Sequence, residues 1–243
     1  MSKVYLITGA SSDVGIAFIR RVIQQGDTVI AQGAGDLSGL AELCQAYPGA
    51  IHTYDVDLSD SNATDLFIQD VQNNYPLPTH IIHLPALRVI NTKFKNFDEQ
   101  RFALDLNVQI FSAVKICKAF LPKMAKARYG RVLFMLTSYL LGVPPKNTAA
   151  YVMAKSTLQG LAKSLAADYA SFGITVNCVM PSMMETKFLA DTSDLIVQAS
   201  AEANPMGRNA HVEDVVPAMA FLVSDEAAFI TGVTLPITGG SAL

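Results

Sequence analysis

The chain opens with a short apolar run that ends in a glycine-containing turn and then becomes helical. Val4-Tyr5-Leu6-Ile7 stops at the segment Thr8-Gly9-Ala10-Ser11-Ser12-Asp13-Val14-Gly15. From Val14 to Ile23 the apolar residues recur at helical spacing, and Gly26 follows as a stop signal. A buried strand, a tight turn and a helix in this order form the first part of a βαβ unit. The rest of the chain is therefore constrained to add parallel strands to the same sheet.

The turn between these two elements has the chemistry of a phosphate-binding loop. Gly9 permits a tight turn, and the helix after it presents unpaired backbone N–H groups at its positive end. Both features favour a diphosphate. We expect contacts to a nucleotide cofactor from the residues of this turn, namely Gly9, Ser11, Ser12, Asp13, Val14 and Gly15.

The alternation of apolar runs and helical patterns continues along the chain without a break in composition. It predicts further strands over residues 28–32, 51–54, 79–84, 131–136, 174–179 and 233–237, and helices that include 98–124, 148–172 and 212–223. The expected fold class is α/β: a single-domain, Rossmann-like, doubly wound parallel sheet of about seven strands over residues 1–243, with helices on both faces. Residues 182–210 show weak periodicity, and we expect a mobile substrate loop there.

The composition excludes several classes of protein. Hydrophobic residues make up 51% and charged residues 16%, which fits a packed globule rather than a disordered chain. A net charge of −3 leaves no electrostatic footprint for nucleic acid. Six basic residues between Lys115 and Arg131 predict a solvated face, with the docking of a phosphate-bearing carrier as an alternative.

The sequence also carries expectations about compartment and metals. No signal peptide and no apolar run of membrane-spanning length are visible, so we expect a soluble cytoplasmic protein that does not bind a membrane. Cys44, Cys117 and Cys178 lack metal-type spacing and read as reduced thiols. Alternation along a strand puts His80 and His83 on different sheet faces, and we predict no metal site.

A tyrosine and a lysine one helical turn apart are the main candidates for chemistry. Tyr151 and Lys155 share a helix face, and an ammonium beside a phenol favours the phenolate, so Tyr151 is a candidate general acid and base. Tyr151 lies 13 residues after Ser138 (151 − 138), enough for the chain to loop out and return a helix. The Gly turn, Asp57, Ala86, Ser138 and Pro181 each follow a predicted strand and should meet at one sheet edge with this pair.

At this point the chain resembles the short-chain dehydrogenase/reductase family, from about Lys3 to Gly240. The matching residues are Thr8-Gly9-Ala10 with Gly15, Asp57-Leu58, Asn107, Ser138, Tyr151, Lys155, Pro181 with Thr186, and Gly239-Gly240. Asn204-Pro205-Met206-Gly207-Arg208, followed by Glu213-Asp214-Val215, resembles the 3-oxoacyl-carrier-protein reductase branch.

The resemblance implies an NAD(P)(H)-dependent oxidoreductase that interconverts a ketone and a secondary alcohol, with a small-molecule substrate that is free or carrier-bound. Tyr151 would exchange a proton with the substrate, Lys155 would hold the ribose and lower the pKa of Tyr151, Ser138 would polarise the carbonyl, and Asn107 would hold a relay water. Thr186 would meet the carboxamide and Asp57 the adenine. Further cofactor contacts are expected from Leu58, His83, Pro85, Pro181 and Met184. The resemblance also implies a homotetramer built through the long helices.

Three departures from the family pattern keep alternatives open. Asp13 stands where the family usually has glycine, and its charge should weaken diphosphate binding unless the side chain turns away to cap the helix. The family's Asn-Asn-Ala-Gly is replaced by His83-Leu84-Pro85-Ala86. Ser182 stands where the family usually has a glycine after Pro181. A non-catalytic nucleotide sensor or structural partner subunit is therefore one alternative, and a sugar or polyol dehydrogenase is another.

Cofactor choice and substrate are only partly indicated. Gly33 and Ala34 stand where a carboxylate would select NAD or an arginine NADP, and Asp36 lies too far round the turn, so NADP(H) is slightly preferred over NAD(H). Apolar residues flank the expected site and fit either an apolar substrate pocket or ordinary core packing: Leu140, Leu141, Val143, Met183, Met184, Phe188 and Leu189.

Overall fold

Seven parallel strands form one sheet in the computed structural model, which describes residues 2–241. The spatial order is β3-β2-β1-β4-β5-β6-β7, so the chain winds outward in one direction from β1 and in the other from β4. The strands are β1 Val4–Thr8, β2 Thr28–Gly33, β3 Ile51–Asp55, β4 His80–His83, β5 Gly130–Met135, β6 Ile174–Pro181 and β7 Thr234–Ile237. This order confirms the predicted doubly wound parallel sheet, whose crevice lies at the β1/β4 switch point.

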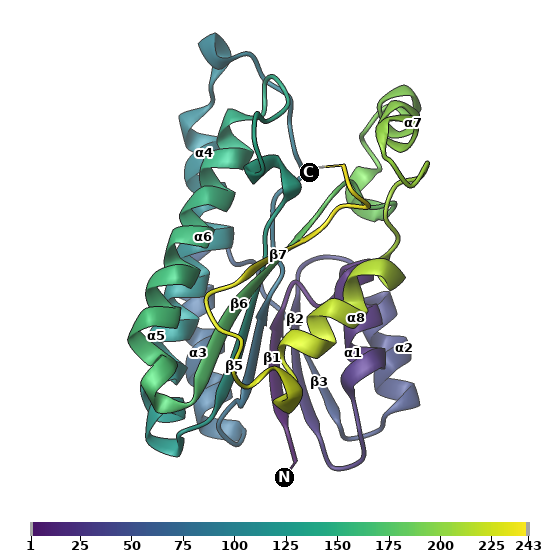
Figure 1. The fold of residues 1–243 in the computed structure, drawn as a ribbon. Helices are drawn as coiled ribbons and strands as arrows, with labels where there is room; N and C mark the ends of the chain where they lie inside the picture. The colour runs from purple at the N-terminus through teal and green to yellow at the C-terminus, as the bar shows by residue number, and fades with distance from the viewer. Residues whose placement is uncertain (1, 242–243) are drawn as a thin grey trace.

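Helices cover both faces of the sheet (Figure 1). One layer contains α1 (Asp13–Val22), α2 (Ser38–Ala46) and α8 (Val212–Leu222). The other contains α3 (Ser61–Asn74), α4 (Glu99–Leu106), α5 (Ser112–Ala127) and α6 (Ala149–Tyr169). Helix α7 (Asp194–Ala203) stands beyond the carboxyl ends of the strands (Figure 1). Within the described residues, no helix has both the length and the apolar character needed to cross a membrane.

Two apolar cores lie on the two faces of the sheet because strand side chains alternate. In β1, Leu6 packs in the core that contains Phe120 of α5, whereas Ile7 packs in the core that contains Phe18 of α1. All five residues of β1 are buried. A strand buried on both faces reads as a continuous apolar run, which is the pattern that identified it in the sequence.

Two helices were not predicted, and both contribute little to the cores. Helix α7 buries none of its residues, and α2 buries only Leu40 and Leu43. An amphipathic period arises from burial of one helix face, so a helix that packs little leaves a weak period. Helix α7 lies inside the stretch 182–210, for which we expected only a loop.

The helix expected over residues 98–124 is interrupted at the asparagine that the resemblance singled out. Helix α4 ends at Leu106, the segment Asn107–Phe111 is π-helical, and α5 begins at Ser112. The Asn107 amide donates a hydrogen bond to the Ser59 carbonyl at 3.2 Å. Asparagine is a poor residue for a helix interior, and single π turns are frequent at functional sites.

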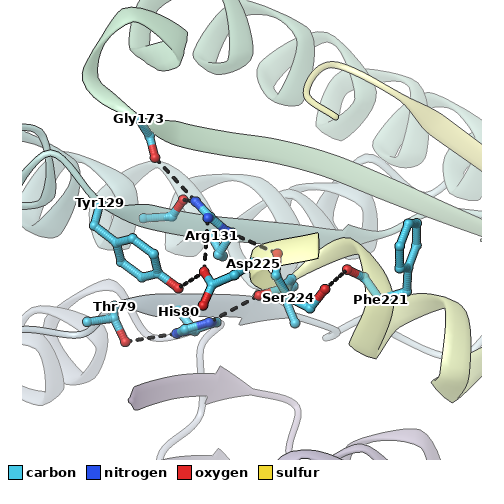
Figure 2. A network of polar contacts seen from close by, with 10 residues as sticks. Thr79, His80, Tyr129, Arg131, Gly173, Phe221, Ser224 and Asp225 are labelled. Carbon is cyan, nitrogen blue, oxygen red and sulfur yellow. Dashed lines mark hydrogen bonds and ion pairs between the residues drawn. The ribbon is translucent and has the colours of Figure 1, made fainter. Parts of the chain in front are cut away.

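A polar network ties segments together at the amino-terminal edge of the sheet (Figure 2). Arg131 is 4% exposed, and its guanidinium donates to the Gly173 carbonyl (3.2 Å), the Ser224 carbonyl (3.4 Å) and the Asp225 carboxylate (3.2 Å). The Tyr129 hydroxyl donates to the same carboxylate at 2.8 Å, and its ring lies 4.5 Å below the Arg131 guanidinium carbon. The predicted solvated face therefore does not include Arg131, because this side chain turns inward and satisfies buried carbonyls.

Candidate active site

A cavity of about 600 Å³ lies at the carboxyl edge of the sheet. Its walls come from the turn after β1, from the ends of the other central strands, from α6 and from the segment after β6. It brings together most of the residues predicted from the sequence: Gly9, Ser11, Ser12, Asp13, Val14, Asp57, Leu58, Pro85, Tyr151, Lys155, Pro181, Met184 and Thr186. Residues from distant parts of the chain thus line one site.

The glycine-containing turn needs glycine at two positions. Gly9 has a φ of 68°, a left-handed conformation that L side chains rarely adopt. A Cβ at Gly15 would lie 2.5 Å from the Ala10 carbonyl oxygen, so any other residue would push the helix away from the turn. Gly15 does not line the cavity, and its role in the site is to permit this close packing.

The start of α1 fits a bound diphosphate. Ser12 caps the helix, since its hydroxyl accepts from the Gly15 N–H at 3.1 Å and donates to the Gly9 carbonyl at 2.7 Å. Among residues 2–241, no protein acceptor is recorded for the N–H groups of Asp13 and Val14, and both residues line the cavity. Free N–H groups at a helix start are the usual ligands of phosphate oxygens.

The Asp13 side chain does not cap the helix, which corrects the expectation. Its carboxylate instead accepts a hydrogen bond of 2.7 Å from the backbone N–H of Lys187, 174 residues later in the chain. The carboxylate thus turns toward the segment after β6 and joins the two walls of the cavity.

Helix α6 brings Tyr151 and Lys155 to the cavity as predicted, but the contact between them differs from the expectation. Lys155 is 1% exposed, and its ammonium donates to the Met135 carbonyl at 2.8 Å. The ammonium nitrogen lies 5.8 Å from the centroid of the Tyr151 ring. Desolvation lowers the pKa of Lys155 to about 8, and the negative charge of Asp105 opposes this shift.

The structure does not support the predicted lowering of the Tyr151 pKa by Lys155. Desolvation raises the pKa of Tyr151, and the main opposing influence is the Thr137 hydroxyl. The charges of Tyr139 and Asp105 raise it further. In this structure the phenol is therefore a protonated group that is able to donate a proton.

The hydroxyl that acts on the pKa of the phenol belongs to Thr137 rather than to Ser138. Thr137 is 6% exposed and lines the cavity, as does Tyr139, whose ring packs edge-on to the Tyr151 ring with 6.0 Å between centroids. Ser138 lies between them at the start of a short helical turn, Ser138–Leu140, and is not among the residues lining the cavity. Thr137 was missed because the sequence does not show which of two adjacent hydroxyls turns inward.

Two other predicted site residues lie behind the cavity wall. Asn107 does not line the cavity, but the next residue of the π turn, Val108, does. His83 is buried between the Thr8 hydroxyl (2.7 Å) and the Gln109 carbonyl (2.9 Å), and desolvation lowers its pKa to about 3. His83 thus joins β4 to the π turn and does not face a cofactor.

Further lining residues were not singled out from the sequence. Asp36, which we placed too far round the turn, lines the cavity after all. The remaining ones are Gln32, Leu87, Arg88, Val89, Val108, Met135, Leu136, Thr137, Tyr139 and Lys187. Some of these residues stand next to the end of a strand, and this position could have identified them as lining the site. No sequence signal pointed to Arg88 or Lys187, which come from loops.

The apolar residues expected around the substrate divide into two groups. Met183, Met184, Phe188 and Leu189 line the cavity. Leu140 and Leu141 pack against a core instead, and Val143 is 97% exposed. The segment after β6 therefore supplies the expected apolar residues that line the cavity, and the three expected from the loop before α6 do not line it.

Fold and site together define a class of protein, a doubly wound α/β protein with a nucleotide-type helix start and a tyrosine–lysine pair in one cleft. A family model described as enoyl-(acyl carrier protein) reductase matches residues 9–242. A 3-oxoacyl-(acyl-carrier-protein) reductase FabG from Pseudomonas aeruginosa is 30% identical over 242 residues, which cover 98% of this chain and 96% of that protein. The dehydrogenase/reductase SDR family member 6 of Rattus norvegicus is 31% identical over 249 residues, with 99% and 98% covered.

A solved structure agrees with these sequence matches. A gluconate 5-dehydrogenase from Burkholderia cenocepacia, in complex with NADP and tartrate, superposes with a TM-score of 0.88 at 18% identity and covers 99% of this chain and 96% of its own. The chain belongs to the short-chain dehydrogenase/reductase family. It is an oxidoreductase that acts on CH–OH groups of a small-molecule substrate, in a family that uses NAD(P).

Proposed function

We propose that the protein interconverts a ketone and a secondary alcohol in the cytoplasm, with NADP(H) slightly preferred over NAD(H), and that a 3-oxoacyl thioester is the first substrate class to test. The observation that carries this proposal is the single cavity of about 600 Å³ that holds the start of α1 at one part of its wall and Tyr151 with Lys155 at another. This volume falls within the range of small-molecule and cofactor sites.

The residues of the turn would hold the cofactor, and the nicotinamide supplies a hydride when it is bound. Tyr151 donates its phenolic proton to the carbonyl oxygen, and burial supports this role because it keeps the phenol protonated. Lys155 would hold the ribose, and its ammonium would stabilise the negative charge that the phenol acquires when its proton leaves. Asp57 and Thr186 would lie at the adenine and the carboxamide, because both line the cavity.

Two adjacent hydroxyls are candidates for polarising the carbonyl. Ser138 is the residue that the family resemblance implies, and Thr137 is the one that lines the cavity with Tyr151. A hydroxyl that donates to the oxygen as negative charge develops stabilises the transition state. The position of Thr137 favours it for this part.

The remaining parts of the proposal concern the relay, the substrate loop and the assembly. Asn107 would hold a water that returns protons to Lys155, which the π turn at this residue supports. Residues 182–210 would form the substrate segment within a single domain, and its mobile part would be the stretch around α7, which buries none of its residues and lies beyond the Met184–Ala210 pairing. A homotetramer is supported by exposed apolar side chains on the α4–α6 layer, which include Leu104, Phe111, Val114 and Met153.

Titration with NADPH and NADH, followed by nicotinamide fluorescence, tests the proposal first. We expect binding at sub-millimolar concentration for at least one of them. A screen of ketones, polyols and acyl thioesters, with a carrier-bound 3-oxoacyl group among them, then identifies the substrate class. Absence of binding to both dinucleotides would overturn the proposal, and turnover confined to polyols would favour the polyol dehydrogenase instead.

A further inference from the structure

A lysine from the segment after β6 lies across the cavity near the start of α1. The backbone N–H of Lys187 donates to the Asp13 carboxylate at 2.7 Å. The same segment is tied down nearby, since Met184 pairs with Ala210 and the Glu185 N–H donates to the Ala210 carbonyl at 3.0 Å. The pairing of residues 184 and 185 with Ala210, together with the bond from the Lys187 N–H to Asp13, fixes the backbone from which the Lys187 side chain extends.

The side chain of Lys187 points toward the loop after β2. Its ammonium nitrogen lies 3.9 Å from a carboxylate oxygen of Asp36. Both side chains are exposed to solvent, at 73% and 69%, and both residues line the cavity. The loop after the second strand is where a Rossmann-type site meets the adenosine ribose, so this ammonium lies at the ribose end of the cavity.

Lys187 supplies a cation that the sequence around β2 lacks. Enzymes that take a 2′-phosphate usually place an arginine near the end of the second strand, but here Gly33, Ala34 and Gly35 occupy this place. Among residues 2–241, three cationic side chains line the cavity, and the other two are linked to Tyr151 rather than to the loop after β2. Lys155 follows Tyr151 on α6, and Arg88 shares a smaller adjoining cavity with Tyr151.

We infer that Lys187 is the specificity-determining residue for the adenosine 2′-phosphate, held in position by Asp13 and delivered from the segment after β6. This inference rests on the proposed dinucleotide-dependent function and deepens it. In the protein alone, Asp36 is the partner of this ammonium. A 2′-phosphate carries more negative charge than one carboxylate and presents several acceptor oxygens, so it replaces Asp36 as the partner. A dinucleotide with a free 2′-hydroxyl leaves the Asp36–Lys187 pair intact.

The test compares binding of two matched pairs of probes to the full chain. NADPH and NADH are titrated by nicotinamide fluorescence, and adenosine 2′,5′-bisphosphate and adenosine 5′-monophosphate by calorimetry, which needs no turnover. For Lys187→Met we expect the preference for the 2′-phosphorylated member of each pair to fall about tenfold at low salt. Lys187→Arg should retain the preference, and Asp36→Asn should raise it roughly threefold because a competing acceptor is removed.

Arg88→Met is the matched control, since it removes a cation that lines the same cavity near Tyr151. Its preference ratio should equal that of the wild type. Thermal melting checks that each variant folds. Because the side chains of Lys187 and Asp36 are exposed, we expect their substitution to leave the fold intact. An unchanged ratio in Lys187→Met, or equal weakening of both members of a pair, overturns this inference while dinucleotide binding itself stands. Loss of all dinucleotide binding by the wild type would instead overturn the proposed function and this inference together.

Discussion

At the residue scale, a few buried groups set the proton chemistry of the site. The charge of Asp105 acts on the pKa of both Lys155 and Tyr151. Asp105 is 7% exposed, and its carboxylate accepts a hydrogen bond from the Gln109 amide at 2.6 Å. Its negative charge raises the pKa of both groups, against the desolvation that lowers that of Lys155 to about 8. Asp105 is therefore a positioning residue that keeps the ammonium charged near neutral pH.

The first prediction concerns the pH profile of Asp105→Asn. Removal of the negative charge should lower the pKa of Lys155 below about 8, so the ammonium loses its proton at lower pH. The basic limb of the profile of kcat/KM should therefore move toward lower pH. Asp191→Asn, which removes an exposed carboxylate paired with Arg88, is the control and should leave the limb in place. A profile of Asp105→Asn identical to the wild type would contradict this role.

The second prediction separates the two adjacent hydroxyls. Because Thr137 lines the cavity with Tyr151, Thr137→Val should reduce kcat about 100-fold, the effect expected for loss of one donor to a developing oxyanion. Ser138→Ala should reduce it by less than about fivefold, since its hydroxyl does not line the cavity. Steady-state kinetics with the best ketone measures both. The reverse order would return the role to Ser138.

The sequence predicted those site residues whose geometry is determined by their spacing on a helix. It did not predict those whose geometry is determined by the conformation of a loop. The spacing of Tyr151 and Lys155 predicted that they share a helix face, and the 13-residue separation of Ser138 and Tyr151 predicted that this face returns to the sheet edge where the cavity lies. The inward turn of Thr137 and the contact of Lys187 with Asp36 depend on loop conformation, which no period encodes.

At the scale of elements, the two edges of the sheet differ: one carries the cavity and the other carries a polar network that joins segments of the chain. The carboxyl edge holds the cavity, and the amino edge holds the Arg131 network, which joins β5 to the turn after α6 and to the turn after α8 (Figure 2). Four acceptors would lose this donor if the side chain were removed: the carbonyls of Gly130, Gly173 and Ser224, and the Asp225 carboxylate. Buried acceptors without a donor cost more than the net strength of a hydrogen bond.

The third prediction follows for stability. Arg131→Met should lower the free energy of unfolding by about 2–4 kcal/mol, because carbonyls buried with the guanidinium are left unpaired. Lys123→Met, an exposed member of the same basic run, should change it by less than about 0.5 kcal/mol. Urea denaturation of both variants makes the comparison. Equal effects would show that Arg131 is an ordinary surface residue.

Burial explains much of which elements were predictable. All seven strands were expected: the five inner ones are buried apolar runs, and the edge strands β3 and β7, which are less buried, are short stretches bounded by turn residues. Helix α7 buries no residue and was missed. The break at Asn107 was foreshadowed by a poor helix former, but the π turn that follows from it was not, since helical periodicity hardly changes across a single extra residue.

At the scale of the whole molecule, each of the two cores contains a neutral histidine. His80 stacks on Tyr5 and its ring contacts the Val223 carbonyl at 3.1 Å, whereas His83 lies on the other face against the π turn. Desolvation lowers the pKa of both to about 3. The alternation of His80 and His83 between faces was predicted, and it follows directly from the period of a strand.

The fourth prediction is loss of stability in acid. In the unfolded chain a histidine takes up a proton near pH 6.5, but these two stay neutral in the folded protein until about pH 3. The unfolded state therefore binds more protons between these limits, and stability falls as the pH is lowered from about 6.5 toward 3. Urea denaturation at several pH values measures the slope. His83→Gln should make the slope shallower, and the same substitution at His52, a half-exposed imidazole, is the control. An unchanged slope in His83→Gln would contradict this origin.

The central claim is that Tyr151 gives its proton to a carbonyl in a cavity that also holds the dinucleotide. Single-turnover oxidation of bound NADPH by a ketone, followed by nicotinamide absorbance in the wild type and in Tyr151→Phe, tests it directly. We predict that Tyr151→Phe binds NADPH with an affinity within about threefold of the wild type but transfers hydride about 1,000-fold more slowly. Hydride transfer at the wild-type rate in Tyr151→Phe would contradict the claim.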